Sequence, residues 1–352
     1  MGSTPLDSGH MSTLATRTHL QTPPDPREAP PLRWGILGAG GIAGRFAREV
    51  PALSAQQVVA VGSRDLARAE AFAQTHALAR AHGSYAGLVT DPEVDVVYVA
   101  TPHSHHHAHA IQALEAGKPV LVEKAFTRNA AEAREVFAVA ERQGLFAMEA
   151  MWSRFLPHMV ALRDLVVSGR LGEILAVHGD HGQRLPHVER LREPSLAGGA
   201  LLDLGVYPIS FIHSLLGRPG SVHAVGMLSE LGVDVHEAVT LAYGNAVGLA
   251  TANMWARTRT AASVIGTEGR VDIDGVFYVP GRLSVTPADG EVWTWPDGEP
   301  APGGFQYQAA EVARRVSAGE RESDVMPWAS TVEVMEIMDE VRRQLGVVYP
   351  GE

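Results

Sequence analysis

A glycine-rich segment early in the chain has the residue types that bind a phosphate. Positions 33–44 have the sequence RWGILGAGGIAG, a Gly-x-Gly-x-x-Ala pattern between an apolar run and a helical stretch. In such a turn the first glycine allows a tight bend, the second lets the backbone approach a pyrophosphate, and the helix N-terminus attracts its charge. The strand–turn–helix setting favours a dinucleotide site over a merely structural turn. The predicted contacts are Gly38, Gly40, Gly41 and Ile42.

The end of the next apolar run indicates which dinucleotide binds. Enzymes that use NAD commonly place a carboxylate about 20 residues after the glycines, where it holds the ribose 2′-hydroxyl. Here the run Val58–Val61 continues into Gly62, Ser63 and Arg64. Asp65 comes one position too late and suits the N-cap of the next helix. A hydroxyl and a guanidinium suit a 2′-phosphate, so Ser63 and Arg64 favour NADP over NAD, with a surface arginine as the alternative.

A lysine, an aspartate and a tyrosine could carry acid–base chemistry. Lys124 follows the run Val120–Val122, and the carboxyl end of a central parallel strand faces the ligand crevice. From position alone, a solvated surface lysine explains Lys124 equally well. Asp203 and Tyr207 are four residues apart, which places them on one helix face. A tyrosine there is usually a core residue, but beside a lysine its pKa is expected to fall toward the range useful for proton transfer.

A histidine-rich tract follows the third apolar run. It has the sequence TPHSHHHAH over positions 101–109. His105 and His109 would share one helix face while His103 and His106 point elsewhere, and no matching carboxylate cluster accompanies them. We therefore expect the tract to line a cofactor cleft and not to bind a metal. The cofactor contacts predicted here are Thr101, Pro102, His103 and His106.

The elements that would position these residues alternate between apolar runs and helical stretches. The predicted strands are Trp34–Leu37, Val58–Val61, Val94–Ala100, Val120–Val122 and Phe146–Met148. The predicted helices between them are Ile42–Val50, Asp65–Gln74, His105–Ala116 and Ala130–Gln143. Continuous apolar strands are typical of a parallel sheet covered by helices on both faces. The pattern predicts a doubly wound, Rossmann-type α/β domain over residues 32–150.

In residues 151–352 the predicted strands and helices no longer alternate regularly. It begins with a predicted helix Met159–Ser168, a strand Ile174–His178 and a helix Ala200–Leu215. Five more strands are predicted at Ser221–Gly226, Glu237–Ala242, Ala246–Met254, Ala262–Ile265 and Arg270–Ile273, before two helices at Phe305–Ala318 and Met326–Leu345. This pattern predicts an α+β domain with a largely antiparallel open sheet. We expect the C-terminal helix to pack back on the first domain.

Composition limits the classes of protein to consider. A length of 352 residues suggests two domains at roughly 150 residues each. The lack of cysteine excludes disulfides, thiolate metal sites and a cysteine nucleophile, and it is compatible with the cytoplasm. A net charge of −11 argues against nucleic-acid binding, and no apolar run approaches the ~20 residues of a membrane span. Residues 1–31, polar and proline-rich, are predicted to be a disordered tail.

Together these motifs resemble a known family of oxidoreductases. It is the glucose–fructose oxidoreductase, inositol dehydrogenase and rhizopine-catabolism family (Gfo/Idh/MocA), and within it the dimeric dihydrodiol dehydrogenase and NADP-dependent D-xylose dehydrogenase branch. The resemblance extends from Arg33 to the C-terminus. The segments that carry it are Gly38–Gly44, Gly62–Asp65, Thr101–His106, Ala113–Lys124, Met148–Phe155 and Gly198–Tyr207.

The resemblance implies roles for individual residues. Lys124 and Tyr207 would be the catalytic pair, with Asp203 beside them and Glu123 as a further cofactor contact. The open second sheet would serve substrate and subunit contacts. The chain departs from the common family pattern at three positions. Ala125 stands where many members have proline, His103 where asparagine is common, and Tyr207 where sugar and inositol members have histidine, although the named branch has tyrosine.

We therefore expect an NADP-dependent dehydrogenase acting on CH–OH groups, which transfers hydride between a pyranose or cyclic polyol and the nicotinamide. A trans-dihydrodiol or dicarbonyl oxidoreductase is the first alternative. The substrate contacts considered are Trp152, Arg154 and Phe155, although domain-interface core explains the two aromatic residues equally well. A non-catalytic NADP-binding sensor is the rival from another class, and the presence of Lys124 and Tyr207 argues against it. We expect a cytoplasmic homodimer or higher homo-oligomer.

Overall fold

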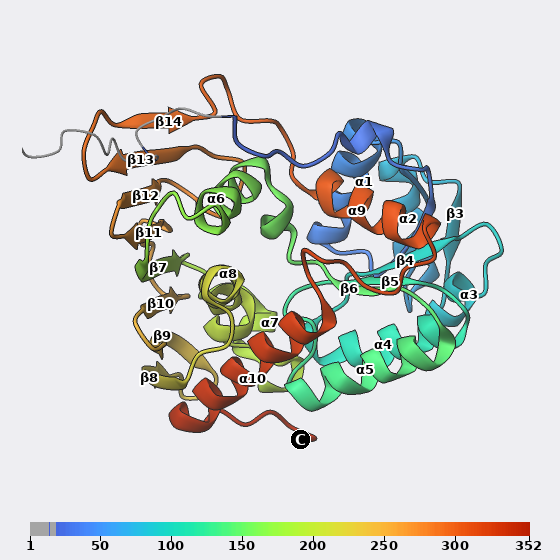
Figure 1. The fold of residues 1–352 in the computed structure, drawn as a ribbon. Helices are drawn as coiled ribbons and strands as arrows, with labels where there is room; N and C mark the ends of the chain where they lie inside the picture. Colours follow the sequence, from blue (N-terminus) through green and yellow to red (C-terminus); the bar gives the residue numbers. More distant parts are fainter. Residues whose placement is uncertain (1–13, 15–18) are drawn as a thin grey trace, which may run out of the picture.

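The computed structural model describes Leu14 and residues 19–352, and it contains two sheets with helices around them (Figure 1). The first sheet is parallel and six-stranded, with the order β3-β2-β1-β4-β5-β6. Its strands are β1 (Arg33–Leu37), β2 (Gln57–Gly62), β3 (Arg80–His82), β4 (Val96–Val99), β5 (Val120–Val122) and β6 (Ala147–Glu149). Its helices are α1 (Gly41–Leu53), α2 (Leu66–His76), α3 (Tyr85–Val89), α4 (His103–Glu115) and α5 (Ala130–Gln143).

The first sheet confirms the doubly wound architecture. All four residues of β4 and all three of β5 are buried, as expected for strands covered on both faces. Figure 1 shows α1 and α2 on one face of the sheet and α4 and α5 on the other. The strand order changes direction between β1 and β4, so a ligand crevice is expected at the carboxyl ends of these strands. The sequence did not predict β3 and α3, because both are short and β3 is only partly buried.

The second sheet has eight strands in the order β14-β13-β12-β11-β7-β10-β9-β8. They are β7 (Ile174–Gly182), β8 (Ser221–Leu228), β9 (Asp234–Ala242), β10 (Val247–Asn253), β11 (Ala262–Gly266), β12 (Gly269–Ile273), β13 (Leu283–Pro287) and β14 (Trp293–Trp295). Only β7 and β10 pair in parallel, so the predicted, largely antiparallel sheet is confirmed. Burial alternates along β10, which leaves one face of the sheet open. The sequence missed β13 and β14.

The helices α6 (Pro157–Val167), α7 (Glu189–Arg192, a short one) and α8 (Val206–Leu216) lie between the second sheet and the first domain (Figure 1). Helix α9 (Phe305–Ser317) lies against α1, and α10 (Trp328–Leu345) extends from β8 to α5. Short 3₁₀ turns lie at Pro26–Glu28, Trp152–Phe155 and Pro194–Leu196, and a π-helical turn at Leu201–Gly205 precedes α8. The sequence predicted one regular helix where the π turn and α8 occur.

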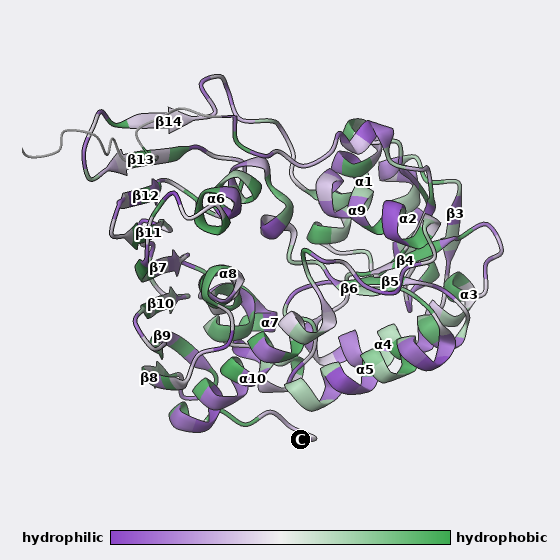
Figure 2. Ribbon diagram, viewed as in Figure 1, coloured by the Kyte–Doolittle hydropathy of each residue, from purple (hydrophilic) through white to green (hydrophobic). Residues whose placement is uncertain are grey.

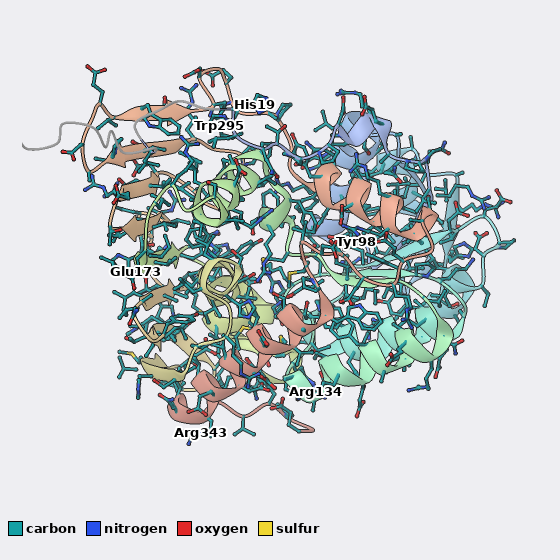
Figure 3. The ribbon with its side chains drawn as sticks, in the orientation of Figure 1. His19, Tyr98, Arg134, Glu173, Trp295 and Arg343 are labelled. Carbon is teal, nitrogen blue, oxygen red and sulfur yellow. The ribbon has the colours of Figure 1, made fainter. Side chains whose placement is uncertain are left out.

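The two C-terminal helices join the domains. Phe305 of α9 packs near Phe46 of α1, with 6.4 Å between ring centroids. The backbone N–H of Ala130, at the start of α5, donates to Asp339 of α10 over 2.9 Å. Arg134 lies on α5 beside α10 (Figure 3) and forms an ion pair with Glu336. The C-terminal helix therefore packs back on the first domain, and the last helices belong to both.

One segment of the described chain, Pro194–Leu216, is long and apolar enough to cross a membrane by composition. This overturns the expectation that no apolar run approaches that length. However, 89% of its most apolar stretch is buried inside the protein. Figure 2 shows α8, the main part of this segment, as a hydrophobic helix against the second sheet. A helix that is apolar on all sides and buried is the core helix of a domain.

The described part of the N-terminal region is ordered, and the prediction of a disordered tail is wrong for it. Leu14 and Leu20 are buried, and the indole of Trp293 donates to the carbonyl of Leu14 over 3.0 Å. Further along, Pro30 accepts a hydrogen bond from Gln56 over 2.8 Å. Trp293 belongs to the second sheet and Gln56 to the first domain, so this segment crosses both. Positions 1–13 and 15–18 lie outside the described residues, and there the prediction stays untested.

Replacing Leu20 with alanine is expected to destabilise the protein. Removing a buried leucine side chain costs ~2–5 kcal/mol, which in a protein of 352 residues lowers the Tm by roughly 1–2 °C per kcal/mol. Thermal melts followed by circular dichroism measure the effect. Thr22→Ala, in an exposed residue of the same segment, is the control and should leave Tm unchanged. Equal melting of the two variants would mean that the segment contributes nothing to stability.

Candidate active site

The turn after β1 has the shape of a pyrophosphate cradle. Gly38 has φ +103°, and a Cβ there would lie 2.7 Å from the carbonyl oxygen of Ala100, so only glycine fits. Gly40 is the N-cap of α1 and contributes no side-chain cap, and a Cβ on Gly40 or Gly41 would meet nothing within 4 Å. The helix N-terminus is thus uncovered, with open space where a phosphate would lie. This turn fits the diphosphate of a dinucleotide.

Two residues after β2 have different roles: Asp65 caps a helix, whereas Arg64 is an exposed cation. Asp65 caps α2, because its carboxylate accepts from the backbone N–H of Ala67 over 3.0 Å. This carboxylate is therefore the N-cap of the helix, as the sequence predicted. Ser63 is buried, whereas Arg64 is exposed. Among the described residues Arg64 has no hydrogen-bond or ion-pair partner, so its guanidinium is available to a ligand at this edge of the sheet.

The histidine tract supports the backbone around Lys124. His106 is buried, and its two ring nitrogens lie 2.9 Å from the carbonyl oxygen of Ala125 and 2.7 Å from that of Thr101. His103 is also buried, with Nε2 3.2 Å from the carbonyl oxygen of Lys124, and burial lowers its pKa to about 3. The Lys124–Ala125 peptide bond itself is cis. Both histidines therefore contact the lysine turn. Within the described chain no group of three potential ligands is arranged to hold a metal.

Lys124 and Asp203 form the centre of the site. Nζ of Lys124 donates to the backbone carbonyl of Asp203 over 2.7 Å and lies 3.4 Å from its Oδ1. Nη2 of Arg190 donates to the same Oδ1 over 3.0 Å. Burial alone would raise the pKa of Asp203, but the charges of Lys124 and Arg190 lower it below its ordinary range. Asp203 is therefore a buried carboxylate shared by two cations. The surface-lysine alternative is wrong, since the Lys124 side chain is only 12% exposed.

Tyr207 lies against Lys124, but not in the way the sequence suggested. Nζ of Lys124 is 4.9 Å from the centroid of the phenol ring, while the hydroxyl accepts a hydrogen bond from the indole of Trp152 over 2.8 Å. Burial, and next the charge of Glu123, raise the pKa of Tyr207 above its ordinary value. The expectation that Lys124 lowers this pKa is therefore wrong. The low dielectric around the ring outweighs the nearby ammonium.

Glu123 is a further buried polar residue beside Lys124. It is buried, accepts a hydrogen bond from the hydroxyl of Tyr98, and lies 3.2 Å from the backbone N–H of Lys124. Burial raises its pKa, which the adjacent Lys124 opposes. Figure 3 labels Tyr98 within the first domain, where it belongs to β4. Glu123 therefore supports the lysine at the carboxyl end of β5.

A buried carboxyl pair on β9 holds the π turn that carries Asp203. Asp234 accepts from the backbone N–H of Leu201 over 2.5 Å, and a Cβ on Gly199, where φ is +117°, would lie 2.2 Å from its Oδ1. Glu237, also buried, stands against Gly205 at the other end of the turn. Both acids thus contact the backbone that presents Asp203 to Lys124. No sequence motif indicated this role.

Glu237→Gln is expected to stabilise the protein at high pH. Burial, with the adjacent Asp234, holds the pKa of Glu237 well above its ordinary value. Its contribution to stability is therefore complete below the unfolded-state pKa of about 4.3 and is lost as pH rises toward the folded-state value. Glutamine has the same shape and stays neutral, so the variant should have a higher Tm than wild type at about pH 8 and a similar Tm at about pH 4. Exposed Glu230→Gln is the matched control, and the same difference at both pH values would contradict the account.

Comparisons with known proteins agree with this geometry. Residues 32–151 match the oxidoreductase family with an NAD-binding Rossmann fold, Gfo/Idh/MocA, and residues 159–272 match the C-terminal domain of the same family. The chain belongs to this family. The predicted family is thereby confirmed, and the protein is an NAD(P)-binding oxidoreductase. Both matched regions contain site residues: Lys124 lies in the first, and Asp203 and Tyr207 lie in the second.

Similar proteins extend the comparison. The chain is 40% identical over 334 residues to trans-1,2-dihydrobenzene-1,2-diol dehydrogenase of Mus musculus and 39% identical to that of Homo sapiens, covering 91% of this chain and 99% of each relative. A 3-ketoreductase of Actinomadura kijaniata, solved with NADP and TDP-benzene, is 27% identical with a TM-score of 0.78, covering 90% of this chain and 98% of its own. An aldose–aldose oxidoreductase of Caulobacter crescentus shares the fold, with a TM-score of 0.81 at 23% identity, covering 90% and 98%.

The three predicted substrate residues have different positions. Trp152 belongs to the site, because its indole holds Tyr207. Arg154 is buried and donates to the hydroxyl groups of Ser210 and Ser330, both over 2.9 Å. Phe155 is buried in the main hydrophobic core. Neither Arg154 nor Phe155 contacts the lysine centre, so the structure gives them supporting positions within the family fold.

Two residues that sequence reasoning did not place at the site, Tyr278 and Gln183, line it beside His181. Tyr278, in the loop between β12 and β13, stacks on Tyr207 with 4.2 Å between ring centroids. Gln183 donates to the hydroxyl of Tyr278 over 2.6 Å and lies 2.9 Å from His181. His181 itself packs 5.3 Å from Tyr207. Only the fold brings these side chains together, since His181 and Gln183 lie at the end of β7 and Tyr278 lies in a loop 95 residues after Gln183.

Proposed function

We propose that this protein is an NADP-dependent dehydrogenase that moves hydride between the alcohol carbon of a pyranose or related cyclic polyol and the nicotinamide. The observation that carries the proposal is the contact of Lys124 with Asp203 and Tyr207 at the carboxyl end of a nucleotide-binding sheet. A largely buried lysine beside a phenol, at the carboxyl end of the nucleotide-binding sheet, can supply the acid–base catalysis of alcohol oxidation and carbonyl reduction.

Each residue has a distinct role in this proposal. Lys124 donates a hydrogen bond to the substrate oxygen and stabilises negative charge that develops there. Tyr207 exchanges the hydroxyl proton with the substrate, while Trp152 and Tyr278 hold its ring. Asp203 fixes the lysine. Bound NADP supplies the nicotinamide carbon that gives or accepts the hydride.

The cofactor contacts are proposed from the open surfaces around the first sheet. Gly38, Gly40, Gly41 and Ile42 would hold the diphosphate, and Ser63 with Arg64 the 2′-phosphate. Thr101 and Pro102, at the start of α4, border the same crevice. Glu123 and Lys124 would border the nicotinamide. The 3-ketoreductase solved with NADP supports this choice of cofactor by its similar fold.

Arg64→Ala is expected to weaken NADP binding far more than NAD binding. The lost contact to a phosphate is charge-assisted and worth ~1.5–3 kcal/mol, or roughly tenfold or more in Kd. Fluorescence titration with each reduced cofactor measures the two affinities. Arg48→Ala, an exposed arginine of α1, is the control. If Arg64→Ala weakens NADP binding and NAD binding equally, Arg64 does not bind the 2′-phosphate.

A second candidate function is oxidation of trans-dihydrodiols or reduction of dicarbonyls. It is favoured by the aromatic wall of Tyr278 and Trp152 beside Tyr207 and by the names of the curated relatives. Both candidates use the same catalytic residues and differ in the substrate ring. A sensor that only binds NADP would not need the buried Lys124–Asp203 contact.

A spectrophotometric panel tests the proposed function. Purified enzyme is mixed with pyranoses, inositols, trans-dihydrodiols and dicarbonyls, each with NADP(H) and NAD(H), and the nicotinamide absorbance is followed. Turnover with at least one sugar or diol, faster with NADP and absent in Lys124→Met, is expected. Tight NADP binding without turnover on any class would instead identify a sensor.

We also propose a homodimer or higher homo-oligomer formed through the open face of the second sheet. Val225 is 71% exposed on that sheet, and Val247 and Leu249 are each about 40% exposed. Clustered apolar side chains on an open sheet are typical of subunit contacts. Light scattering should give a mass of two or more chains, and Val225→Arg should lower it.

A further inference from the structure

Arg190 reaches the catalytic centre from outside it. It lies on the short helix α7, in a loop between β7 and the π turn. Its Nη2 donates to Oδ1 of Asp203 over 3.0 Å, yet its side chain remains 44% exposed while that of Asp203 is 9% exposed. The guanidinium therefore has one nitrogen on the buried carboxylate, while the side chain is partly exposed to solvent.

The loop around Arg190 is fixed by contacts of its own. Leu191 is fully buried in a small apolar cluster with Val235 and Met254, separate from the main core. The backbone N–H of Gly199 donates to the carbonyl of Leu191 over 2.9 Å. A Cβ on Gly198 would lie 2.6 Å from that same carbonyl oxygen, so the two backbones pack closely. These backbone contacts thus fix the position of Arg190 relative to the turn that carries Asp203.

Arg190 and Lys124 share one oxygen atom. Oδ1 of Asp203 lies 3.4 Å from the lysine Nζ and 3.0 Å from the arginine Nη2. A guanidinium has five N–H donors, and in the part of the chain that the structure describes Arg190 makes no other hydrogen bond. Two cations therefore contact the same carboxylate oxygen, and only one of them is needed to hold the reacting oxygen.

We propose that Arg190 binds a second substrate oxygen, on the carbon adjacent to the reacting carbon. This inference rests on the proposed function, and it makes Arg190 the residue by which the site distinguishes vicinal diols, and their hydroxy-carbonyl or dicarbonyl products, from simple alcohols. Lys124 holds the reacting oxygen, and the free edge of the guanidinium holds its neighbour. Pyranoses, inositols and trans-dihydrodiols all have this pair of oxygens, so one residue accounts for both candidate substrates. A simple secondary alcohol lacks the second oxygen and leaves Arg190 without its partner.

The substitution Arg190→Ala tests this role. Because a partly exposed ion pair adds little stability, the variant is expected to fold. With a vicinal diol such as trans-cyclohexane-1,2-diol, or the best diol of the panel, KM should rise about 10- to 100-fold with a smaller change in kcat. With the matched monodeoxy alcohol, kcat/KM should change little, so the preference for the diol falls. Arg190→Lys should retain part of the diol affinity, and guanidinium ion added to Arg190→Ala should lower its KM again.

Two controls separate the possible outcomes. Arg192→Ala removes an exposed arginine from the same short helix and should leave both substrates unaffected. Equal losses for the diol and its monodeoxy analogue, or no change in KM for the diol, would overturn the role of Arg190 while leaving the proposed function in place. If the wild-type enzyme turns over no sugar or diol with either cofactor, the proposed function fails and this inference fails with it.

Discussion

Replacing Tyr207 with phenylalanine is expected to lower kcat by about 10²- to 10⁴-fold, the usual contribution of a positioned acid–base group. The ring remains, so its stacking on Tyr278 and its contact with Lys124 are preserved. Only the hydroxyl that Trp152 holds is lost. The variant should therefore fold and bind NADP as wild type does, with a loss of stability of about 1–3 kcal/mol from the unpaired indole N–H of Trp152. Steady-state kinetics at saturating cofactor, with NADP affinity measured separately, give the result.

The pH dependence of both directions adds a second readout to this prediction. Because burial raises the pKa of Tyr207, the phenol is protonated at neutral pH. Carbonyl reduction uses the protonated phenol as its acid, so its rate should be retained at neutral pH. Alcohol oxidation uses the deprotonated phenol as its base, so its rate should increase as pH rises. Tyr243→Phe, which removes a hydroxyl bound to the carbonyl of Gly217, is the matched control. Near wild-type kcat in Tyr207→Phe would make Tyr207 a core residue, with His181 the next candidate.

Lys124→Met should be at least as severe, with a loss of kcat of about 10³-fold or more. Methionine keeps the length and apolar stem of lysine but removes the hydrogen bond to the substrate oxygen and the charge beside it. It also leaves Asp203 buried with Arg190 as its remaining cation. The substitution can therefore reduce stability as well, and melting must be measured alongside kinetics.

The chain offers a sharp control for this second prediction. It contains only two lysines, Lys118 and Lys124. Lys118 donates to the backbone carbonyls of Asp91 and Val94, over 3.0 and 2.6 Å. It precedes β5, whereas Lys124 follows that strand, so the two lysines lie at opposite ends of it. Lys118→Met should lower stability without lowering kcat. A comparable loss of kcat in both variants would show that charge or folding, rather than the position of Lys124, explains the effect.

Sequence patterns predicted the parts of this molecule that local rules determine. The turn at Gly38 and Gly40 has a fixed geometry that few residues can adopt, and β4 and β5 are continuous apolar runs. The spacing of Asp203 and Tyr207 also predicted that they share one helix face, although the chain winds there as a π turn. In each case neighbouring residues alone carry the information.

The rest depends on contacts between segments far apart in the chain. The pKa of Tyr207 is set by its burial among Trp152, Tyr278 and Glu123, which no single motif contains. Leu14 and Leu20 have no apolar periodicity around them, yet the finished surface of both domains buries them. Arg190 is one of several arginines in an irregular loop, and only the close packing on Gly198 and Gly199 brings it to Asp203. Such tertiary effects override local patterns.

A double-mutant cycle on Lys124 and Tyr207 tests the central claim most directly. The claim is that the two side chains act as one catalytic unit, and kcat at saturating NADP is measured for wild type, Tyr207→Phe, Lys124→Met and the double variant. Groups that act together are not additive, so the double variant should fall within about threefold of the slower single variant. A double variant slower by the product of the two single effects would contradict the account, because the two residues would then contribute independently.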